Sequence, residues 1–510
     1  MAYNYMEETI SEVYERLNGD KQSSLTRAED SAKLTIPSVF PSSDFDDTTS
    51  LDDVYQSLGA RAVLSLASKL LQSLFPVNQT FFKLLPSKEL EEQILSGEDP
   101  KLLDTLNAGL VKLETGLQHE MDRQSIRTPL HEALKLSLVT GNALLWKEPK
   151  SKKGFSVFTL RNYCVKRDTS GNLLDLVIRE KVSPRTLPED IVLTEEKEDV
   201  YIYTRMVNDG EGNYQKYQEV EDKVVAGSDE TFRINEDTTP FIILRWTSVP
   251  NSNYGRGLVE HYIGDLRNYE AMNMVMVDLA SVMSKVVYMV NPNTQHGTDV
   301  EDLNNATTGD YIAGHADDIT VPQTNKNSDL NALLNYMQTL ELRLSQAFLL
   351  FTSRDAERVT AKEIARTAQQ LEETLGGVYS LLSDELQKPL LSLFIKELNI
   401  KLDTQIEPVI TSGLEALGRG NDANKLMQFI EGLGVIPEGW NEVNKNTLVN
   451  RLAYATGIDV DNLIKTVEQK EAEQKAMQEQ AMQQQLGASM AQNGGKVLAE
   501  QAGANPQLLQ

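Results

Sequence analysis

Residues 258–286 read LVEHYIGDLRNYEAMNMVMVDLASVMSKV, and this stretch decides the fold. Apolar residues recur in it at alternating spacings of three and four, as expected for an α-helix with one apolar face. Asp278 and Lys285 lie within its most apolar part, so we do not expect a membrane span. The stretch therefore predicts a helix whose seam packs against a neighbour, within the chain or from another subunit. The seam consists of Met272, Val275, Leu279, Val282 and Val286.

Two more helices are predicted after this one. The second covers about 328–351, and a compact insert at 291–323 separates it from the first. The insert predicts a short helix at VEDLNNA and strands at GDYIAG and ITVPQ, with VVYMVNP leading into it. The third helix covers about 361–399. Gly376, Gly377 and Pro389 interrupt its apolar stripe, which predicts a bend.

The first half of the chain predicts helices followed by a β-rich region. Helices are expected at about 3–34, from 51 to 74, at 101–123 and at 129–145, the last broken near Gly141. Between 155 and 246, short β-branched and aromatic runs alternate with turns such as TSGN and NDGEGN, which indicates antiparallel strands. The fold class is therefore mainly α with a β-rich subdomain (α+β). A chain of 510 residues is expected to form several subdomains.

Composition and motifs argue against most enzyme and nucleic-acid-binding classes. The net charge of −26 disfavours affinity for phosphates, although it fits either plain solubility or a surface past which DNA slides. Neither a phosphate-binding GxxxxGK[ST] loop nor an HExxH pair occurs. The single cysteine, Cys164, is expected to be a packed core thiol in a reducing compartment. We expect no catalytic site, no cofactor and no metal. The polar, charged N-terminal residues do not resemble a signal peptide.

One short break concentrates cations in this acidic chain. Arg354, Arg358 and Lys362 lie between the second and third predicted helices. An ordinary solvated loop would explain them. The alternative is a loop that presents basic side chains to an anionic partner.

Several stretches carry a resemblance to a known family. They are LTIPSVFP, LGARAVLSLASKLLQSLFP, TGNALLW, YGRGLVEHYIGDLRNYE, SKVVYMVNP, RVTAKEI, LEETLGGVYSLLSDELQKPLL and IEPVITSGLEALGRGNDANKL. In this order, over nearly the full chain, they resemble the portal (head–tail connector) proteins of short-tailed bacteriophages of the autographivirus type. No single motif is decisive, and the order of all of them carries the resemblance.

The resemblance implies a plan for the whole chain. A wing would cover 1–253, with helices to 150 and the β-rich part at 151–253. Two stem helices would cover 254–286 and 327–350, with a clip at 287–326 between them. The remaining parts would be a tunnel loop (351–361), a spine helix (362–400), a crown (401–467) and a Gln-rich tail (468–510) that is a helical barrel or disordered.

The resemblance also implies a passive function. The chain would form a dodecameric ring at one capsid vertex, the conduit for DNA packaging and ejection and the attachment site for the tail. Arg354, Arg358 and Lys362 would face the DNA channel. The clip would contact the large terminase subunit and later the tail adaptors, through candidates His296, Asp299, Glu301 and His315. Other expected partners are the major capsid, scaffolding and internal core proteins and double-stranded DNA, bound without sequence specificity. Assembly would occur in the host cytoplasm, and the mature location would be the virion.

Two other classes stay open at this point. One is an acidic enzyme with an unrecognised carboxylate site, and the other is a different virion protein, such as a tail adaptor or an internal core protein. Gel filtration and negative-stain microscopy separate them, since only the portal hypothesis predicts a ring with a hole as wide as duplex DNA.

Overall fold

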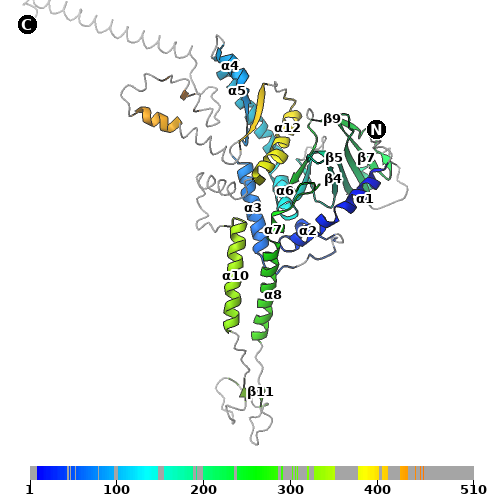
Figure 1. Cartoon of the computed structure of the whole chain (residues 1–510), viewed down its shortest axis with the longest axis vertical. Helices are drawn as coiled ribbons and strands as arrows, with labels where there is room; N and C mark the ends of the chain where they lie inside the picture. The colour runs from blue at the N-terminus through cyan, green and yellow to red at the C-terminus, as the bar shows by residue number, and fades with distance from the viewer. Residues whose placement is uncertain are drawn as a thin grey trace, which may run out of the picture. The chain divides into compact units, whose positions relative to one another are not determined.

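The computed structural model describes residues 8–42, 45, 48–51, 53–77, 80–96, 101–147, 154–187, 191, 199–234, 238–284, 289–290, 301, 305, 307, 319–320, 327–350, 377–400, 405–411, 426–434, 443, 448–449 and 452. The chain divides into two units. Met1–Leu90 and Leu113–Gly418 form the first, and Glu91–Lys112 and Arg419–Gln510 form the second. In the second unit the described residues include a helix at 426–434. The first unit combines helices with sheets, which confirms the α+β prediction (Figure 1).

Two helices, rather than the single predicted one, form the N-terminal part. α1 (Ile10–Asp20) and α2 (Gln22–Lys33) meet at Lys21, whose side chain is fully buried. The Lys21 Nζ donates hydrogen bonds of 2.9 and 2.8 Å to the carbonyl oxygens of Leu160 and Tyr163. Burial lowers the pKa of this amine, because the charged form loses its hydration. The chain turns at Lys21, where its amine reaches these carbonyls. The prediction of one continuous helix at 3–34 was therefore wrong.

The next helix begins later than predicted. α3 (Leu58–Leu74) starts at Leu58, after the 3₁₀ turn η1 (Pro37–Val39), and not at Leu51. Gln56 explains the start, because its Oε1 accepts from the Gly59 N–H and its Nε2 donates to the Leu34 carbonyl, both at 2.8 Å. The apolar residues that recur at a spacing of four are buried from that point on, at Leu58, Ala62, Leu66, Leu70 and Leu74.

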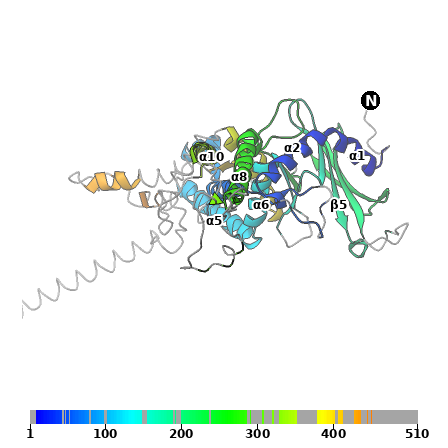
Figure 2. The ribbon, with the colours of Figure 1, turned by 90° about the horizontal axis from the view of Figure 1, so that it is seen from below.

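A six-stranded antiparallel sheet forms the larger part of the β-rich region, as predicted. Its order is β4-β5-β6-β7-β8, with β9 also paired to β7. α1 lies across this sheet, and Figure 2 shows α1 and α2 beside it. The Cys164 thiol is buried in the core under α1, which raises its pKa and confirms a packed thiol. The strands are β4 (Tyr163–Arg167), β5 (Leu173–Val182), β6 (Val200–Asn208), β7 (Asn213–Val220), β8 (Lys223–Val224) and β9 (Glu230–Arg233), with the 3₁₀ turn η2 (Pro184–Thr186) after β5.

A three-stranded sheet corrects the helix predicted at 129–145. α6 (Arg127–Thr140) ends at Gly141, and the chain continues as β2 (Asn142–Trp146). β2 pairs antiparallel with β10 (Phe241–Arg245) and with β3 (Ser156–Phe158). Gly141 adopts the left-handed conformation, with a φ of 79°, and a residue of this kind commonly ends a helix.

A two-stranded sheet joins distant parts of the first unit. β1 (Phe82–Pro86) pairs antiparallel with β13 (Ile406–Ile410), a strand that the sequence did not predict. α4 (Lys88–Ser96) and α5 (Lys101–Arg123) follow β1, and α5 has the predicted bounds. The Leu84 N–H of β1 donates to Glu114 of α5 at 2.7 Å.

The remaining described elements follow the predicted order. α7 (Leu258–His261) and α8 (Ile263–Ser284) precede β11 (Met289–Val290), which pairs with β12 (Ile319–Thr320). α10 (Asn327–Ala347) returns beside α8. A helix at 377–382 continues through the π-helical turn η4 (Ser383–Gln387) into α12 (Lys388–Glu397).

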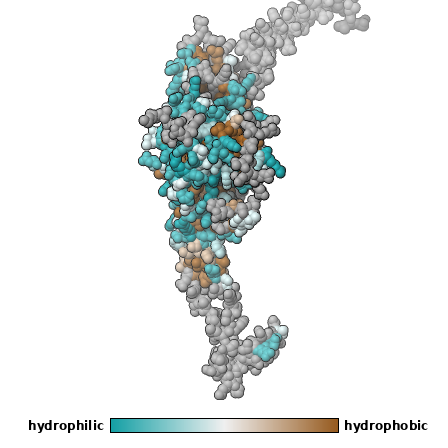
Figure 3. All heavy atoms as spheres, turned by 90° about the vertical axis from the view of Figure 1, so that its right-hand side faces the viewer, coloured by the Kyte–Doolittle hydropathy of each residue, from teal (hydrophilic) through white to brown (hydrophobic). Residues whose placement is uncertain are grey.

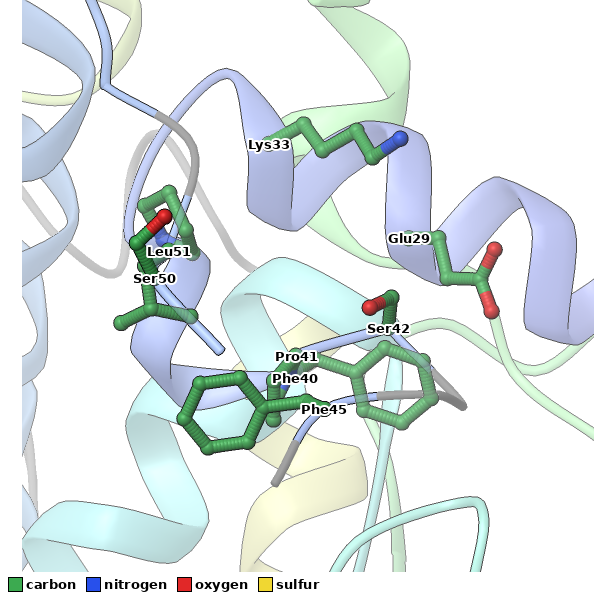
Figure 4. Close-up of a pocket in the computed structure, with 9 residues that line it drawn as sticks. Glu29, Lys33, Phe40, Pro41, Ser42, Phe45, Ser50 and Leu51 are labelled. Atoms are coloured by element: carbon green, nitrogen blue, oxygen red, sulfur yellow. The ribbon is translucent and has the colours of Figure 1, made fainter. Parts of the chain in front are cut away.

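A small cavity beside α2 is large enough only for water. A cavity of about 40 Å³ lies between α2 and the segment after it, and Figure 4 shows Glu29 and Lys33 on α2 above the loop that carries Phe40 and Phe45. This volume suits water, whereas small-molecule sites are about 300 Å³ or larger. Within the described parts of the chain, no cluster of three metal-binding side chains occurs. Among the helices that are described, none is both long and apolar enough to cross a membrane.

Candidate subunit interface

The helices α8 and α10 form a pair that is anchored at one end only. At the anchored end several side chains are buried, including Leu266 of α8, Leu340 and Leu344 of α10 and Phe348 directly after α10. Farther along, none of the residues 271–281 of α8 or 330–339 of α10 is buried. Figure 1 shows the two helices side by side and extending away from the six-stranded sheet. We call residues 263–284 and 327–347 the stem.

The stem carries large apolar side chains on its exposed surface. Val275 and Val277 of α8 are 50% and 54% exposed, and Leu342 of α10 is 60% exposed. Figure 3 shows hydrophobic side chains gathered on the far part of this helix pair. Exposed large apolar side chains in such numbers are typical of a protein–protein contact, because water is a poor solvent for them. The other exposed apolar residues of the stem are Met274, Leu334 and Tyr336.

The helix α8 is apolar on more sides than α10 alone can cover. Successive residues of an α-helix point about 100° apart, so the four residues 274–277, MVMV, face four directions. Met276 is half-buried, while its neighbours in the sequence are exposed. A helix that is apolar all round is normally buried all round. The stem therefore fits an assembly in which further helices contact it on other faces.

Three glycines form the junction where the stem begins, which we call the stem root (residues 141–142 and 255–257). A Cβ at Gly257 would lie 2.8 Å from the carbonyl oxygens of Leu138 and Val139. A Cβ at Gly255 would lie 2.8 Å from the Gly141 carbonyl oxygen. Real Cβ atoms do not approach backbone oxygens this closely, so the end of α6 and the start of α7 can meet only without side chains.

Asn142 completes the stem root with a polar bridge. Its Oδ1 accepts from the Gly255 N–H at 2.8 Å, and its Nδ2 donates to the Gly255 carbonyl at 3.0 Å. The Trp246 N–H donates to the Gly141 carbonyl at 3.0 Å. Because Asn142 is buried, these bonds have no competition from water, and they fix the direction in which the stem leaves the body.

Further polar contacts hold the anchored half of the stem. Arg267 of α8 pairs with Asp30 of α2 at 2.7 Å, and Glu270 accepts from the Tyr55 N–H at 2.8 Å. On α10, Arg343 pairs with Asp265 of α8 at 3.3 Å. These charges are largely exposed, so each pair contributes at most about 1 kcal/mol. The buried apolar seam supplies the larger share of the anchoring.

The predicted seam residues divide between two faces. Met272 and Leu279 are half-buried, whereas Val275 is exposed. The side chain of Val282 and the whole of Val286 lie outside the described residues. The contact with another subunit predicted for this set stays a prediction.

Most other candidate residues cannot be placed. His296, Asp299, His315, Arg354, Arg358, Lys362 and Gly376 lie outside the described residues. Glu301 is exposed, and Gly377 lies in a helix with open space around its Cα. The sequence predicted the break near Gly141 but not its contact with Gly255 and Gly257. A glycine after a helical stripe, as in TGNALLW, is the signal that would have indicated the helix end at Gly141.

Comparison with known proteins gives a consistent family. The model of the family described as "Bacteriophage head to tail connecting protein" matches residues 7–464. The chain is 37% identical to the portal protein of Enterobacteria phage T3, over 91% of this chain and 90% of that protein. It is 36% identical to the portal protein of Escherichia phage T7, over 99% and 96%. A chain of a gene transfer agent virion aligns with a TM-score of 0.40 and 13% identity, over 77% of this chain and 89% of that one.

Proposed function

The chain belongs to the bacteriophage head-to-tail connecting proteins, the portal proteins of short-tailed phages, and we propose that its copies close into a dodecameric ring that conducts DNA. Proteins of this family are structural connectors of the virion rather than enzymes. The ring would stand at one capsid vertex, admit DNA during packaging and release it at ejection.

The exposed apolar surface of the stem carries this proposal. Apolar residues lie on both helices of the pair, at Val275 and Val277 on α8 and at Leu334 and Leu342 on α10. A ring of identical subunits requires two different surfaces on each subunit, one for each neighbour, and a rotation that closes. The α8 and α10 surfaces would serve as these two sides, so that each stem packs between two others.

The acidic composition would suit the channel. A net charge of −26 per subunit gives a surface that repels phosphates and lets a DNA duplex slide. Arg354, Arg358 and Lys362 would form a basic collar at one level of the channel. Residues 287–326 would form the clip, which binds the large terminase subunit and then the tail adaptors. Contacts with the major capsid, scaffolding and internal core proteins and assembly in the host cytoplasm are part of the same proposal.

Electron microscopy of the purified chain tests the ring. We expect ring-shaped particles with a central hole about as wide as duplex DNA, about 20 Å, and a mass corresponding to many subunits. Mass photometry at several protein concentrations gives the stoichiometry. A monomer or small oligomer under all conditions would contradict the proposal.

The basic collar has a separate test. The double variant Arg354→Ala, Arg358→Ala should assemble rings normally but hold packaged DNA less well, because the channel loses two cations per subunit near the phosphates. The fraction of packaged particles that keep their genome measures this effect. The control, Arg185→Ala with Lys223→Ala, removes two exposed cations from the β-rich region and should have no effect. Normal retention in the first variant would exclude the collar.

A further inference from the structure

The helix after residue 376 contains a π-helical turn at a defined place. The α-helical residues 377–382 pass into η4 (Ser383–Gln387) and then into α12. Pro389 accounts for this turn, because proline has no N–H to donate and its ring displaces the carbonyl four residues earlier, at Glu385. Single π-helical turns are rare and occur mostly at functional positions.

Two side chains of this turn bind different parts of the body. Glu385 accepts hydrogen bonds at 2.8 Å from both the backbone N–H and the Nε of Arg245, and its Oε1 also contacts Nη2. Gln387, which is fully buried, donates to the Leu74 carbonyl of α3 at 2.8 Å. The guanidinium and carboxylate of the first pair are both mostly buried, which makes this contact stronger than an exposed ion pair.

Arg245 is also the residue of β10 that leads directly into the stem root. The next residue, Trp246, donates its N–H to Gly141, and Thr247 forms a β-bridge with Arg256. The Arg245 Cβ lies only 2.9 Å from the position that a Cβ on Gly255 would occupy. Arg245 therefore binds the π-helical turn through Glu385 and is followed directly by Trp246, which bonds to the stem root.

An open groove lies between these two parts. Its volume is about 630 Å³. Trp246, Leu258 and His261 line it on the side of the stem root, and Val378 and Leu381 line it on the side of the helix. The Arg245–Glu385 ion pair thus joins the helix and the stem root at one edge of the groove. The open volume of the groove would allow the distance between the helix and the stem root to change.

We propose that the Arg245–Glu385 pair is a latch that couples the helix at 377–397 to the stem root, so that loosening either one loosens the other. In the sequence, this helix follows α10 of the stem after residues 351–376. The Arg245–Glu385 pair then binds the helix to the stem root, from which α7 and α8 begin. Coupling of this kind is reciprocal.

Hydrogen–deuterium exchange on the full chain tests the latch. Glu385→Gln keeps an acceptor for the Arg245 N–H but removes the charge. We expect amide exchange to accelerate on the order of tenfold in peptides of both 377–397 and 241–262, with no change in α1 and α2. The control is Asp384→Asn, the neighbouring carboxylate, whose exposed pair with Lys388 contributes little.

The reciprocal variant completes the test. Asn142→Ala removes the polar bridge of the stem root and should accelerate exchange in 377–387 as well as in 255–262. If the Glu385 variant affects only 377–397, or if Asn142→Ala leaves 377–387 unchanged, there is no latch. Should Glu385→Gln fail to fold, Arg245→Lys replaces it, because lysine keeps the positive charge but lacks the planar guanidinium that binds a carboxylate with two N–H groups. Amide exchange is then compared in the same two regions. Amide exchange can be measured on rings or on monomers. A chain that does not form rings can therefore still show whether the two regions are coupled.

Discussion

Val277→Asp should convert an assembling chain into a monomeric one without unfolding it. Val277 is 54% exposed on the far half of α8, so an aspartate there is hydrated in the free subunit and costs its fold little. In a ring the same carboxylate would be buried against apolar side chains of a neighbour. Burying an unpaired charge costs at least about 3 kcal/mol, or on the order of a hundredfold in association at every contact. The measurement is the particle mass by mass photometry.

A matched control separates interface burial from a general effect of charge. Val224 of β8 is 59% exposed, so Val224→Asp makes the same chemical change on an equally exposed valine outside the stem. It places a carboxylate opposite Glu219, which costs only about 1 kcal/mol or less. We expect Val224→Asp to form rings and Val277→Asp to remain monomeric, with equal far-ultraviolet circular dichroism. If Val277→Asp also forms rings, the exposed face of α8 does not lie in the subunit contact.

Patterns of neighbouring residues in the sequence predicted those helices and strands that are determined by short-range interactions. The helix at 101–123, the stem helices and the antiparallel strands between 156 and 245 follow from apolar period and turn residues. The errors lie where a distant contact overrides the local period. Lys21 interrupts the first helix because its amine reaches carbonyls near residue 160, and Gln56 delays α3 because its side chain binds Leu34 and Gly59. The carbonyls near residue 160 and that of Leu34 are distant in the sequence, so no local pattern contains them.

In the candidate interface too, the sequence predicted local features but not those that depend on distant contacts. The apolar character of α8 was visible in the sequence, but the choice of face was not. A 3-4-3-4 spacing identifies residues that repeat on a helix, and MVMV offers alternative sets with nearly the same spacing. Only the folded structure shows that Met276 is half-buried and Val275 exposed. The contacts within the stem root were missed because glycines marked as turns in a sequence give no indication of what approaches them.

Gly257→Ala should be among the most damaging single changes in the chain. Gly257 has a φ of −78°, which any residue adopts, so the expected cost is steric and not conformational. The new Cβ would meet two carbonyl oxygens of the last turn of α6 at 2.8 Å and the Gly141 nitrogen at 2.9 Å. All three are backbone atoms that cannot rotate away. Overpacking typically costs about 1–3 kcal/mol, and contact with fixed backbone atoms places this change near the upper end. We expect a clear fall in the apparent melting temperature and loss of ring assembly.

The control for this variant lies seven positions further along, in the adjoining helix. Gly264 of α8 has no atom within 4 Å of the position of a Cβ, so Gly264→Ala should stabilise the helix by about 1 kcal/mol. The same substitution should thus have opposite signs at the two glycines. If Gly257→Ala melts like the native chain but no longer forms rings, the stem has changed direction, and the stem root serves to aim it. Native melting and native rings would together mean that α6 and α7 can separate, and the close glycine contact would then have no role in assembly.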